Sequence, residues 1–508
     1  MVAMSNTESL RYDVLVLGTG VAGLSAALSA AQSGASVGVA ERAPRGEHGG
    51  NTRYTEAFLR MKSVEEVSDD FVERFIDESG YHLDPEVVND AMSDRPSGLA
   101  AAQPFLEPRI IDTFASEAGP TLRWMTENGV RFAEASTPFL TSSTTRLAPV
   151  GGGLAIVEAL TPACEAAGVD IRFETVGREL RLDEQGQVIG VRAVHEGRSF
   201  DITAGSVILA CGGFEGNPEM QARYIERAAF TRPVARGGYY NRGEGIAMAL
   251  RAGAAGAGDF ALFHAEPVDP RSGAPEAAIF AFTYGILVNQ EGQRFVDEAT
   301  GTSDATYEAV TRQILRQPGG LAYVIFDDRL DDVPNWRSAL RTDQPAIVAD
   351  TIEELAGKLK VPTTALIETV EVFNRACPDA AAFRAHQPDG LATSNLVPPK
   401  SNWARTVENA PFAAYPVMAS NVFTFGGLKT TEHGQVVSSE GAPMRGLYAA
   451  GEVMGIFFGR YTGSTSVLRG AVFGRLAGLH AAAATTSEAD AETDAARPAR
   501  VTSPALTE

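Results

Sequence analysis

The 508-residue sequence predicts an α/β protein of two or more domains, from two features near its start and one near its end. An apolar strand at residues 12–17 runs directly into the turn Gly18-Thr19-Gly20-Val21-Ala22-Gly23 and a helix at residues 21–33. A second strand, at residues 35–40, ends at Glu41. This order of strand, glycine-rich turn, helix, strand and acid is typical of a Rossmann-like unit that binds a dinucleotide.

Each residue of this unit has a chemical reason. Gly18 and Gly20 permit a tight turn and a close approach of the backbone to phosphate, and Gly23 lets the helix pack on the strand. The helix directs unpaired N–H groups and its positive dipole end at a pyrophosphate. Glu41 stands where a carboxylate accepts hydrogen bonds from ribose hydroxyls.

The third feature lies near the other end of the chain. Gly446-Leu-Tyr-Ala-Ala-Gly451-Glu452 leads into a second helix start, Gly463-Ser464-Thr465-Ser466. A helix N-terminus stabilises negative charge that lies close to it. We therefore expect this helix to face negative charge on the bound cofactor, so that both ends of the chain form one dinucleotide-binding domain.

Bulk composition restricts the partners. A net charge of −21 argues against nucleic acid and anionic membrane surfaces, and any anionic substrate needs local arginines. The three cysteines form no C-x-x-C, so neither disulfides nor a zinc or iron–sulfur site is expected. The first ten residues lack a basic region with a long apolar core, and residues 12–17 are too short to span a bilayer. We therefore expect a cytoplasmic protein without an integral membrane segment.

The middle of the chain differs from both ends. Strands at 179–182, 188–193 and 199–203 form a predicted meander, and a buried strand from Ser206 then ends at Gly212-Gly213. Further helices are expected at residues 64–78, 85–94, 119–128, 154–167 and 351–359. The predicted domains are a dinucleotide-binding domain in two parts (1–260 and 423–484), an inserted α+β capping domain (261–422) and a disordered tail (485–508).

Several local motifs support one family resemblance. They are Gly49-Gly50-Asn51-Thr52, Gly151-Gly152-Gly153, Ala210-Cys211-Gly212-Gly213-Phe214, Gly243-Glu244-Gly245, His264-Ala-Glu-Pro-Val-Asp269, Gly292-Gln-Arg294-Phe295, Phe423-Thr-Phe-Gly426-Gly427 and Ala450-Gly451-Glu452. With the glycine turn and Glu41, they resemble the fumarate reductase/succinate dehydrogenase flavoprotein superfamily, and within it most closely FAD-dependent tricarballylate dehydrogenases.

The resemblance implies a flavoprotein with two dinucleotide-binding domains, FAD as cofactor, and an active site under the capping domain. The implied reaction adds or removes two hydrogens across a C–C bond beside a carboxylate or carbonyl, with hydride transfer at flavin N5 and proton transfer by a side chain. The residues expected to hold FAD are Gly18, Gly20, Val21, Ala22, Gly23, Glu41, Arg42, Gly49, Gly50, Asn51, Thr52, Gly152, Gly153, Ala210, Cys211, Gly212, Gly213, Glu244, Gly451, Glu452, Ser464, Ser466, Val467 and Leu468.

Two residues are expected to bind the substrate. Arg460, just before the second helix start, resembles the arginine that grips the substrate carboxylate in fumarate reductases, through a bidentate contact that only a guanidinium offers. His264 matches a family histidine that holds a substrate carboxylate or carbonyl. Glu266 and Asp269 are placed to orient this histidine.

The acid–base residue stays open, because two positions depart from the family. The matching place for the fumarate reductase arginine acid falls near Ser303, and serine is a poor proton donor at neutral pH. Phe423 replaces a histidine, which points away from fumarate reduction. Related ketosteroid dehydrogenases use tyrosines as acid–base residues, and the remaining candidates are therefore Tyr284, Tyr307, Tyr415 and Tyr461.

His48 precedes Gly49 in the loop where succinate dehydrogenases attach FAD, but its neighbours do not match the attachment segment, so we expect non-covalent FAD. Two alternatives stay open: an enzyme like the 3-ketosteroid dehydrogenases that acts on a larger apolar enone, and a flavin-binding electron-transfer protein. A separate electron acceptor (oxygen, quinone or a redox protein) is expected. The sequence leaves the substrate, the direction, the acceptor and the oligomeric state undecided.

Overall fold

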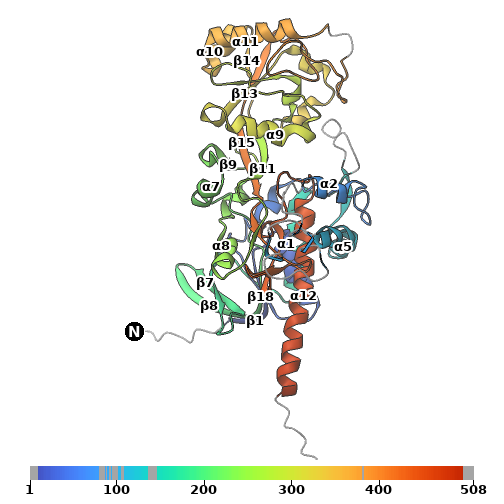
Figure 1. Cartoon of the computed structure of the whole chain (residues 1–508), viewed down its shortest axis with the longest axis vertical. Helices are drawn as coiled ribbons and strands as arrows, with labels where there is room; N and C mark the ends of the chain where they lie inside the picture. The colour runs from blue at the N-terminus through green and yellow to red at the C-terminus, as the bar shows by residue number, and fades with distance from the viewer. Residues whose placement is uncertain are drawn as a thin grey trace, which may run out of the picture.

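The computed structural model describes residues 10–78, 101–103, 108–135, 146–379 and 383–495, together with Glu86, Asn89, Asp90 and Ser93. Two lobes follow one another along the long axis (Figure 1). The lower lobe in this view contains both ends of the described chain, and the upper lobe contains its middle. The strands β9, β11 and β15 run between the lobes. None of the described helices is both long and apolar enough to cross a membrane.

The lower lobe is built on an eight-stranded sheet in the order β17-β18-β8-β1-β2-β5, to which β7 and β6 add a meander beside β8. Strands β1, β2, β5, β8 and β18 pair in parallel, which confirms the Rossmann-like prediction. The bounds are β1 (Leu10–Leu17), β2 (Val37–Ala40), β5 (Asp170–Arg172), β6 (Thr175–Leu182), β7 (Val188–His195), β8 (Arg198–Leu209), β17 (Gln435–Val437) and β18 (Pro443–Ala449).

The register of this sheet brings the sequence motifs to one edge. Leu17 at the end of β1 lies opposite Ala40 of β2 and Leu209 of β8, and Leu209 lies opposite Ala449 of β18. The segments that follow these four strands therefore emerge side by side. At such a carboxyl edge, open α/β sheets bind their ligands.

One strand prediction was wrong. The structure joins the segments predicted at 199–203 and from Ser206 into the single strand β8. Gly205 does not break the strand, because it is packed closely: a Cβ there would lie 2.6 Å from Thr485 and 3.2 Å from the carbonyl oxygen of Asp13.

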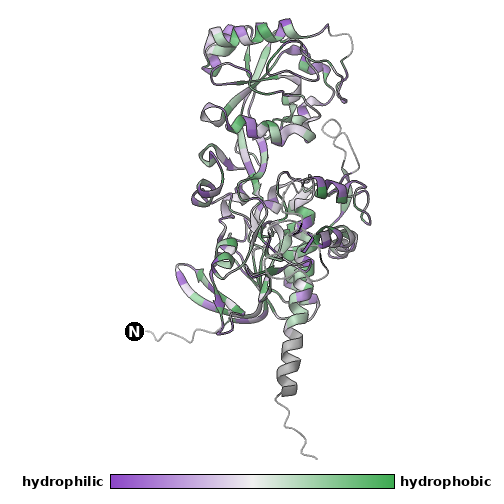
Figure 2. Ribbon diagram, in the orientation of Figure 1, coloured by the Kyte–Doolittle hydropathy of each residue, from purple (hydrophilic) through white to green (hydrophobic). Residues whose placement is uncertain are grey.

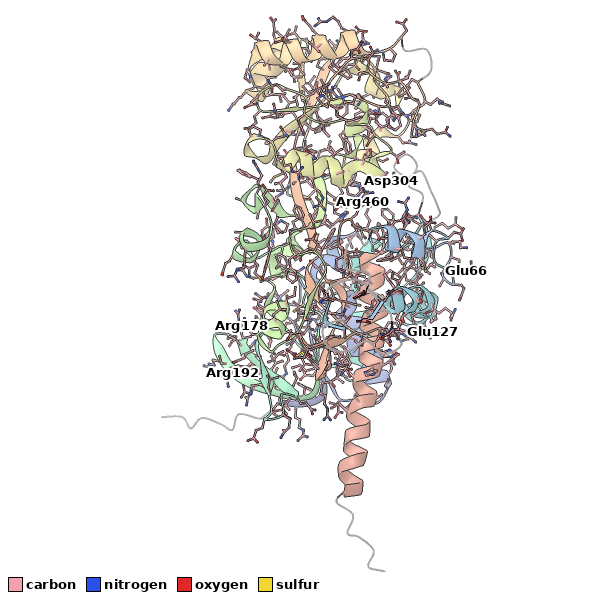
Figure 3. The ribbon with its side chains drawn as sticks, viewed as in Figure 1. Glu66, Glu127, Arg178, Arg192, Asp304 and Arg460 are labelled. Atoms are coloured by element: carbon pink, nitrogen blue, oxygen red, sulfur yellow. The ribbon has the colours of Figure 1, made fainter. Side chains whose placement is uncertain are left out.

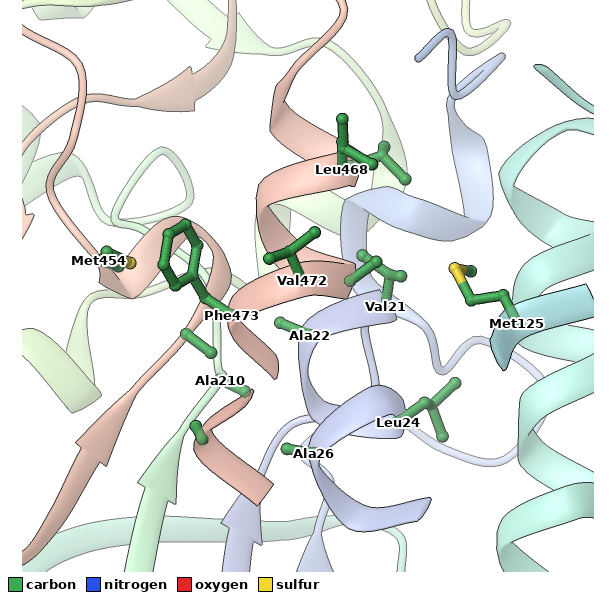
Figure 4. Packing of buried hydrophobic residues seen from close by; sticks show 14 of the residues in the cluster. Val21, Ala22, Leu24, Ala26, Met125, Ala210, Met454, Leu468, Val472 and Phe473 are labelled. Atoms are coloured by element: carbon green, nitrogen blue, oxygen red, sulfur yellow. The ribbon is translucent and has the colours of Figure 1, made fainter. Parts of the chain in front are cut away.

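Two helices, α1 (Val21–Gln32) and α12 (Ser466–Ala495), pack against each other beside the sheet (Figure 4). Gly470, Gly474 and Gly478 recur every four residues on α12 and face α1, where a Cβ on Gly474 would lie 2.3 Å from the Ala22 carbonyl oxygen. The small residues allow this close approach. Figure 4 shows Leu468 and Val472 of α12 beside α1. Since α12 packs closely on α1 between Gly470 and Gly478, its N-terminus is held at the edge of the sheet.

The remaining helices of the lower lobe are α2 (Phe71–Glu78), α5 (Pro108–Glu127), α6 (Gly152–Ala166), α7 (Pro218–Tyr224) and α8 (Glu244–Arg251). The helix predicted at 64–78 begins only at Phe71. The residues before it are extended instead: the Ser68 N–H donates to the Arg60 carbonyl oxygen, and Met61 forms an antiparallel bridge with Val67. The helix predicted at 85–94 lies largely outside the described residues. Helix α12 continues to Ala495 through an alanine-rich segment, so the first part of the tail predicted to be disordered is helical.

The upper lobe has a six-stranded, mainly antiparallel sheet in the order β11-β15-β13-β12, with β14 and β9 also paired to β15. Its elements are β9 (Thr231–Pro233), β11 (Phe263–Val268), β12 (Ile286–Asn289), β13 (Leu321–Phe326), β14 (Ile347–Ala349), β15 (Phe412–Thr424), α9 (Ser303–Leu315), α10 (Ile352–Leu359) and α11 (Thr363–Ala376). Strand β9 precedes the predicted start of this domain at residue 261. Hydrophobic strand segments inside both lobes lie beside helices of mixed polarity, whereas the β7–β8 meander projects from the lower lobe and is itself of mixed polarity (Figure 2).

Short paired strands complete the described fold. They are β3 (Phe132–Ala135) with β4 (Arg146–Pro149), and β10 (Gly256–Ala257) with β16 (Gly427–Leu428). Single-turn helices lie at Gly50–Tyr54, Arg236–Tyr240, Phe280–Tyr284 and Gly451–Val453, among other places.

Candidate active site

Two cavities meet at the carboxyl edge of the large sheet. The first, here called the dinucleotide cavity, runs along the segments that follow β1, β2 and β8. The second, here called the junction cavity, has a volume of about 440 Å³ and lies between the lobes. The two share part of their walls, formed by Thr55, Val422, Phe423, Ser466 and Val467.

The turn after β1 forms one wall of the dinucleotide cavity. A Cβ on Gly18 would lie 2.4 Å from the carbonyl oxygen of Ala210, and one on Gly23 would lie 2.0 Å from that of Gly18. Gly20 differs, because the atoms nearest to its Cβ position lie 3.5 Å away or more. The protein leaves this space open beside the α1 N-terminus, whose first turn has no acidic residue. The geometry fits a pyrophosphate.

A buried carboxylate lies next to this turn. Glu41 accepts hydrogen bonds from the N–H groups of Thr19 at 2.8 Å and Ala43 at 2.6 Å, and from the Thr19 hydroxyl at 2.5 Å. Burial raises the pKa of Glu41, and these hydrogen bonds oppose that effect. The adjacent Arg42 pairs with Glu244, and both line the cavity. The carboxylate is thus fixed in the position expected for a ribose contact.

Seventeen of the residues expected to hold FAD line the dinucleotide cavity: Gly18, Gly20, Val21, Ala22, Glu41, Arg42, Gly50, Asn51, Thr52, Ala210, Cys211, Gly212, Glu244, Gly451, Glu452, Ser466 and Val467. The other seven do not line it: Gly23, Gly49, Gly152, Gly153, Gly213, Ser464 and Leu468. Several of these glycines pack against the backbone of the wall, and Ser464 lines the junction cavity instead. A Cβ on Gly153, for example, would lie 1.8 Å from the Thr52 carbonyl oxygen.

A second buried acidic group borders the same cavity. Glu452 accepts a hydrogen bond from the Thr424 N–H at 2.8 Å, and Asn241 donates to Glu215 at 2.6 Å. Asn51 also donates to Glu215, at 2.7 Å. Burial and the charge of Glu452 raise the pKa of Glu215 well above its ordinary value, and the hydrogen bond from Asn241 opposes this shift. Sequence reasoning missed Glu215 and Asn241, since neither belongs to a glycine motif.

The N-terminus of α12 lies where the two cavities meet. The Tyr461 hydroxyl accepts the N–H groups of Thr465 at 3.0 Å and Ser466 at 3.1 Å. Arg469, in the first turn of α12, is buried and lines the dinucleotide cavity, with its guanidinium 4.7 Å from the Phe457 ring centroid. Burial lowers the pKa of Arg469 to about 10, so it remains a cation. The α12 N-terminus and Arg469 together supply positive potential here.

An aromatic cluster fills the inner end of the junction cavity. His264, on β11, is buried and lies 4.4 Å from the Tyr461 ring and 5.2 Å from the Phe423 ring, measured between centroids. The Tyr307 hydroxyl lies 3.3 Å from His264 Nε2. Burial raises the pKa of Tyr307 well above its ordinary value, so its hydroxyl keeps its proton. Three of the predicted catalytic residues thus meet at this end of the cavity.

Arginines and acids line the outer part. Arg460 lies at the mouth, exposed, across from Asp304 of α9 (Figure 3). Arg460 makes no hydrogen bond or ion pair with any residue that the structure describes. Arg146, missed from the sequence, is buried and donates through Nε to the Ser464 hydroxyl at 3.2 Å. Burial lowers the pKa of Arg146 to about 10, with a further contribution from Arg60.

The structure does not bring two of the candidate tyrosines to either cavity. Tyr284 donates to the Ala385 carbonyl oxygen at 2.5 Å, deep in the upper lobe, and Tyr415 lies on β15 next to Arg271. A catalytic role for Tyr284 is therefore corrected to a structural one. Ser303 is also outside the cavity, because its hydroxyl donates to the Phe280 carbonyl oxygen at 2.6 Å.

Similarity to known proteins agrees with this geometry. Residues 13–468 match the family described as "FAD binding domain". The chain is 28% identical to the NADH:acrylate oxidoreductase of Vibrio harveyi, over 93% of this chain and 50% of that protein, and therefore spans about half its length. It is 26% identical to the vinyl phenol reductase of Lactiplantibacillus plantarum, over 93% of this chain and 96% of that protein.

Two further similarities bear on the family resemblance and on the 3-ketosteroid dehydrogenase alternative. The 3-oxosteroid 1-dehydrogenase of Mycobacterium tuberculosis is 32% identical over 66% of this chain and 63% of that protein. The open conformation of a flavocytochrome c3 fumarate reductase has the same fold, with a TM-score of 0.70 at 24% identity, over 94% of this chain and 79% of that structure. The finer likeness to tricarballylate dehydrogenases stays a prediction. The chain belongs to the FAD binding domain family, within the fumarate reductase/succinate dehydrogenase flavoprotein superfamily, and its cofactor is FAD.

Proposed function

We propose that the protein is an FAD-dependent oxidoreductase that reduces or desaturates a C–C bond next to a carboxylate. The observation that carries this proposal is the wall that the two cavities share at Phe423, Ser466 and Val467. A flavin ring at this wall would face a substrate in the junction cavity. When bound, FAD supplies hydride chemistry at N5.

The residues at this wall suit that chemistry. The α12 N-terminus and the Arg469 cation would stabilise negative charge on the pyrimidine side of the flavin. His264 and Tyr307 are within reach of a substrate and can hold or transfer a proton. This proposal includes the predicted domain boundaries, the predicted cofactor residues and the assignment of the upper lobe as a cap.

Two arginines favour an anionic substrate. Arg146 offers a buried guanidinium to the cavity, and Arg460 offers an exposed one at its mouth. Guanidinium groups bind carboxylates with paired, charge-assisted hydrogen bonds. The named substrate of the NADH:acrylate oxidoreductase is a carboxylate, which agrees with this class. The proposal also includes the separate electron acceptor and the cytoplasmic location that are expected from the sequence.

A neutral enone or a styrene-type alkene is the second candidate. The aromatic cluster of His264, Phe423 and Tyr461 favours it, as do the names of the 3-oxosteroid and vinyl phenol relatives. The same experiment separates the two classes. Anaerobic holoenzyme reduced with dithionite is mixed with acrylate, fumarate or vinyl phenol, and oxidised holoenzyme with 4-androstene-3,17-dione.

We expect acrylate or fumarate to reoxidise the flavin, as seen from its absorbance. Reoxidation by vinyl phenol alone, or flavin reduction by the steroid alone, would replace the carboxylate class with the neutral one. If no compound changes the flavin, the electron-transfer alternative is favoured.

A further inference from the structure

A row of ionisable side chains follows one wall of the junction cavity from its inner end to its outer end. We call this set the acid line: Tyr307, His264, Glu266, Glu276, Arg341 and Glu56. All of its members line the cavity. Its inner end is buried, whereas the side chain of Glu56 is 46% exposed. The acid line therefore connects the aromatic cluster with solvent.

The inner end is set by strand β11. His264 and Glu266 are alternate residues of this strand and lie on the same face. Glu266 Oε1 lies 3.6 Å from His264 Nε2, and the Tyr307 hydroxyl lies 3.3 Å from the same nitrogen. One imidazole nitrogen thus faces both an acid and a phenol.

Two buried polar atoms at this end have no hydrogen-bond partner among the described residues. They are His264 Nδ1 and the second carboxylate oxygen of Glu266, Oε2. Buried polar atoms are normally paired with protein, water or ligand, since leaving one unpaired costs about 1–3 kcal/mol. A cavity of about 440 Å³ has room for such a partner. Both residues line the cavity, and each keeps one polar atom for which the described residues supply no partner.

The outer end is Glu276. Its carboxylate lies 3.3 Å from Arg341, which in turn contacts Glu56 at 2.8 Å. The backbone of Glu276 has φ +47°, a left-handed conformation that residues other than glycine rarely adopt and that often marks functional sites. Burial, helped by the charge of Glu266, raises the pKa of Glu276 to about 8. Its carboxyl group can therefore both hold and release a proton near neutral pH.

We propose that the acid line is the proton relay of the reaction and that Glu276 is its proton store. This inference rests on the proposed function. It answers the question raised by Ser303, whose hydroxyl is bound to a backbone carbonyl and cannot reach the cavity. Tyr307 lies one helical turn farther along α9 and faces the cavity instead.

The relay conserves protons and electrons during reduction of a C=C bond. Bound reduced FAD would supply a hydride to one carbon, and the π electron pair would take the Tyr307 proton at the other carbon. The electrons of the broken O–H bond stay on the Tyr307 oxygen, which regains a proton from His264. Glu266 carries the replacement proton: its carboxylate accepts a proton that Glu276 releases and donates one to His264 Nε2, so Glu266 ends as it began. Solvent near Glu56 reprotonates Glu276, and desaturation runs in the opposite sense.

The protonation state of Glu276 sets the direction in which the reaction rate changes with pH. The groups facing its carboxyl are Glu266 and Glu56, whose charges raise its pKa, and Arg341, whose charge lowers it. Glu276 is protonated below about pH 8 and ionised above it. Reduction needs the proton, so its rate should fall as the pH rises through about 8. Desaturation needs the ionised form, so its rate should rise over the same range.

Two measurements test the relay, both on holoenzyme, with Glu276→Gln as the variant. Glu354→Gln is the matched control, because Glu354 forms a surface ion pair with Lys358 on α10. The first measurement needs no substrate: infrared or ¹³C titration of carboxyl groups, in which a group titrating near pH 8 should vanish only in Glu276→Gln. The second is the rate of flavin reoxidation by acrylate, or by whichever of the compounds named above reoxidises the wild-type flavin.

For Glu276→Gln we expect a rate lower by roughly ten- to a hundredfold, with the inflection near pH 8 lost and FAD content unchanged. Glu276→Asp should restore part of both. A wild-type rate and pH profile in Glu276→Gln would overturn the relay, as would a carboxyl titration near pH 8 that is identical to that of the wild type. If no compound reoxidises the wild-type flavin, the proposed function fails, and the carboxyl titration still decides whether Glu276 stores a proton.

Discussion

The dinucleotide cavity and the junction cavity share a wall but are built from different chemistry. The first is formed mainly by backbone turns at the ends of β1, β2, β8 and β18, where glycines bring chain segments into contact. The second is formed by long charged and aromatic side chains from both lobes. A backbone site binds the constant part of a cofactor, whereas a side-chain site can change with the substrate.

The strongest test of the backbone site is Gly20→Val. Because the surroundings of Gly20 are open in the protein itself, the apoprotein should fold, yet the side chain would occupy the space expected for the pyrophosphate. We expect FAD content close to zero at an unchanged apoprotein Tm. Gly46→Val is the control, since a Cβ there meets no atom within 4 Å and it lies outside the cavity. Full flavin occupancy in Gly20→Val would place the pyrophosphate elsewhere.

The side-chain site should respond to Arg146→Ala with a loss of carboxylate turnover and retention of FAD. Removing a buried charged contact costs on the order of 2–5 kcal/mol, or roughly thirty- to several-thousand-fold in kcat/KM. Arg146→Lys should recover little, since an ammonium group lacks the guanidinium fork. The measurement is kcat/KM for acrylate or fumarate.

Arg460→Ala provides the comparison within the same cavity. The sequence predicts that Arg460 grips the substrate carboxylate, but Arg460 is exposed at the mouth, and solvent weakens exposed contacts. We therefore expect a loss of only roughly three- to tenfold in kcat/KM. An effect larger than that of Arg146→Ala would show that the lobes close over Arg460 when the substrate binds.

The helix that serves both cavities can be tested through Gly474. A Cβ there would lie 2.3 Å from the Ala22 carbonyl oxygen, so Gly474→Ala must push α12 away from α1. We expect a loss of about 1–3 kcal/mol in the free energy of unfolding, together with weaker FAD binding. The same change at Gly357 inside α10, where a Cβ meets nothing, should instead stabilise by about 0.5–1 kcal/mol. Denaturant unfolding of both variants measures the difference.

The contrast between the cavities also explains what the sequence could predict. A turn such as Gly18 to Gly23 acts through backbone geometry, which is local in sequence, and so the parallel sheet and the dinucleotide edge follow from short motifs. Arg146, Glu276 and Arg469 gave no such signal, because their roles arise from which residues the tertiary fold places around them. Tyr284 shows the reverse error, since this tyrosine was a catalytic candidate but its hydroxyl donates to a backbone carbonyl in the upper lobe. Ser303 and Tyr307 both lie on α9, and the packing of this helix decides that Tyr307 lines the junction cavity whereas Ser303 does not.

The smallest expected effect concerns His48 and the mode of FAD attachment. His48 Nδ1 lies 3.2 Å from the Thr19 hydroxyl, which also donates to Glu41 and accepts from the Gly49 N–H. With its single proton donated to Glu41, this oxygen accepts from His48 Nδ1–H. Burial lowers the pKa of His48, so the ring is neutral. His48 therefore supports the ribose end of the dinucleotide cavity, and it does not line that cavity, which favours non-covalent FAD.

For this reason His48→Ala should weaken FAD binding only modestly. Losing one hydrogen bond behind Glu41 costs about 0.5–1.5 kcal/mol, which is roughly two- to tenfold in Kd. Acid precipitation should release FAD into the supernatant from both wild type and variant, as measured by flavin fluorescence. Flavin that stays with the precipitated wild type but leaves His48→Ala would instead show a covalent bond at this residue. Such a bond would require His48 to turn away from Thr19 and reach the shared wall of the two cavities, where the flavin ring is expected.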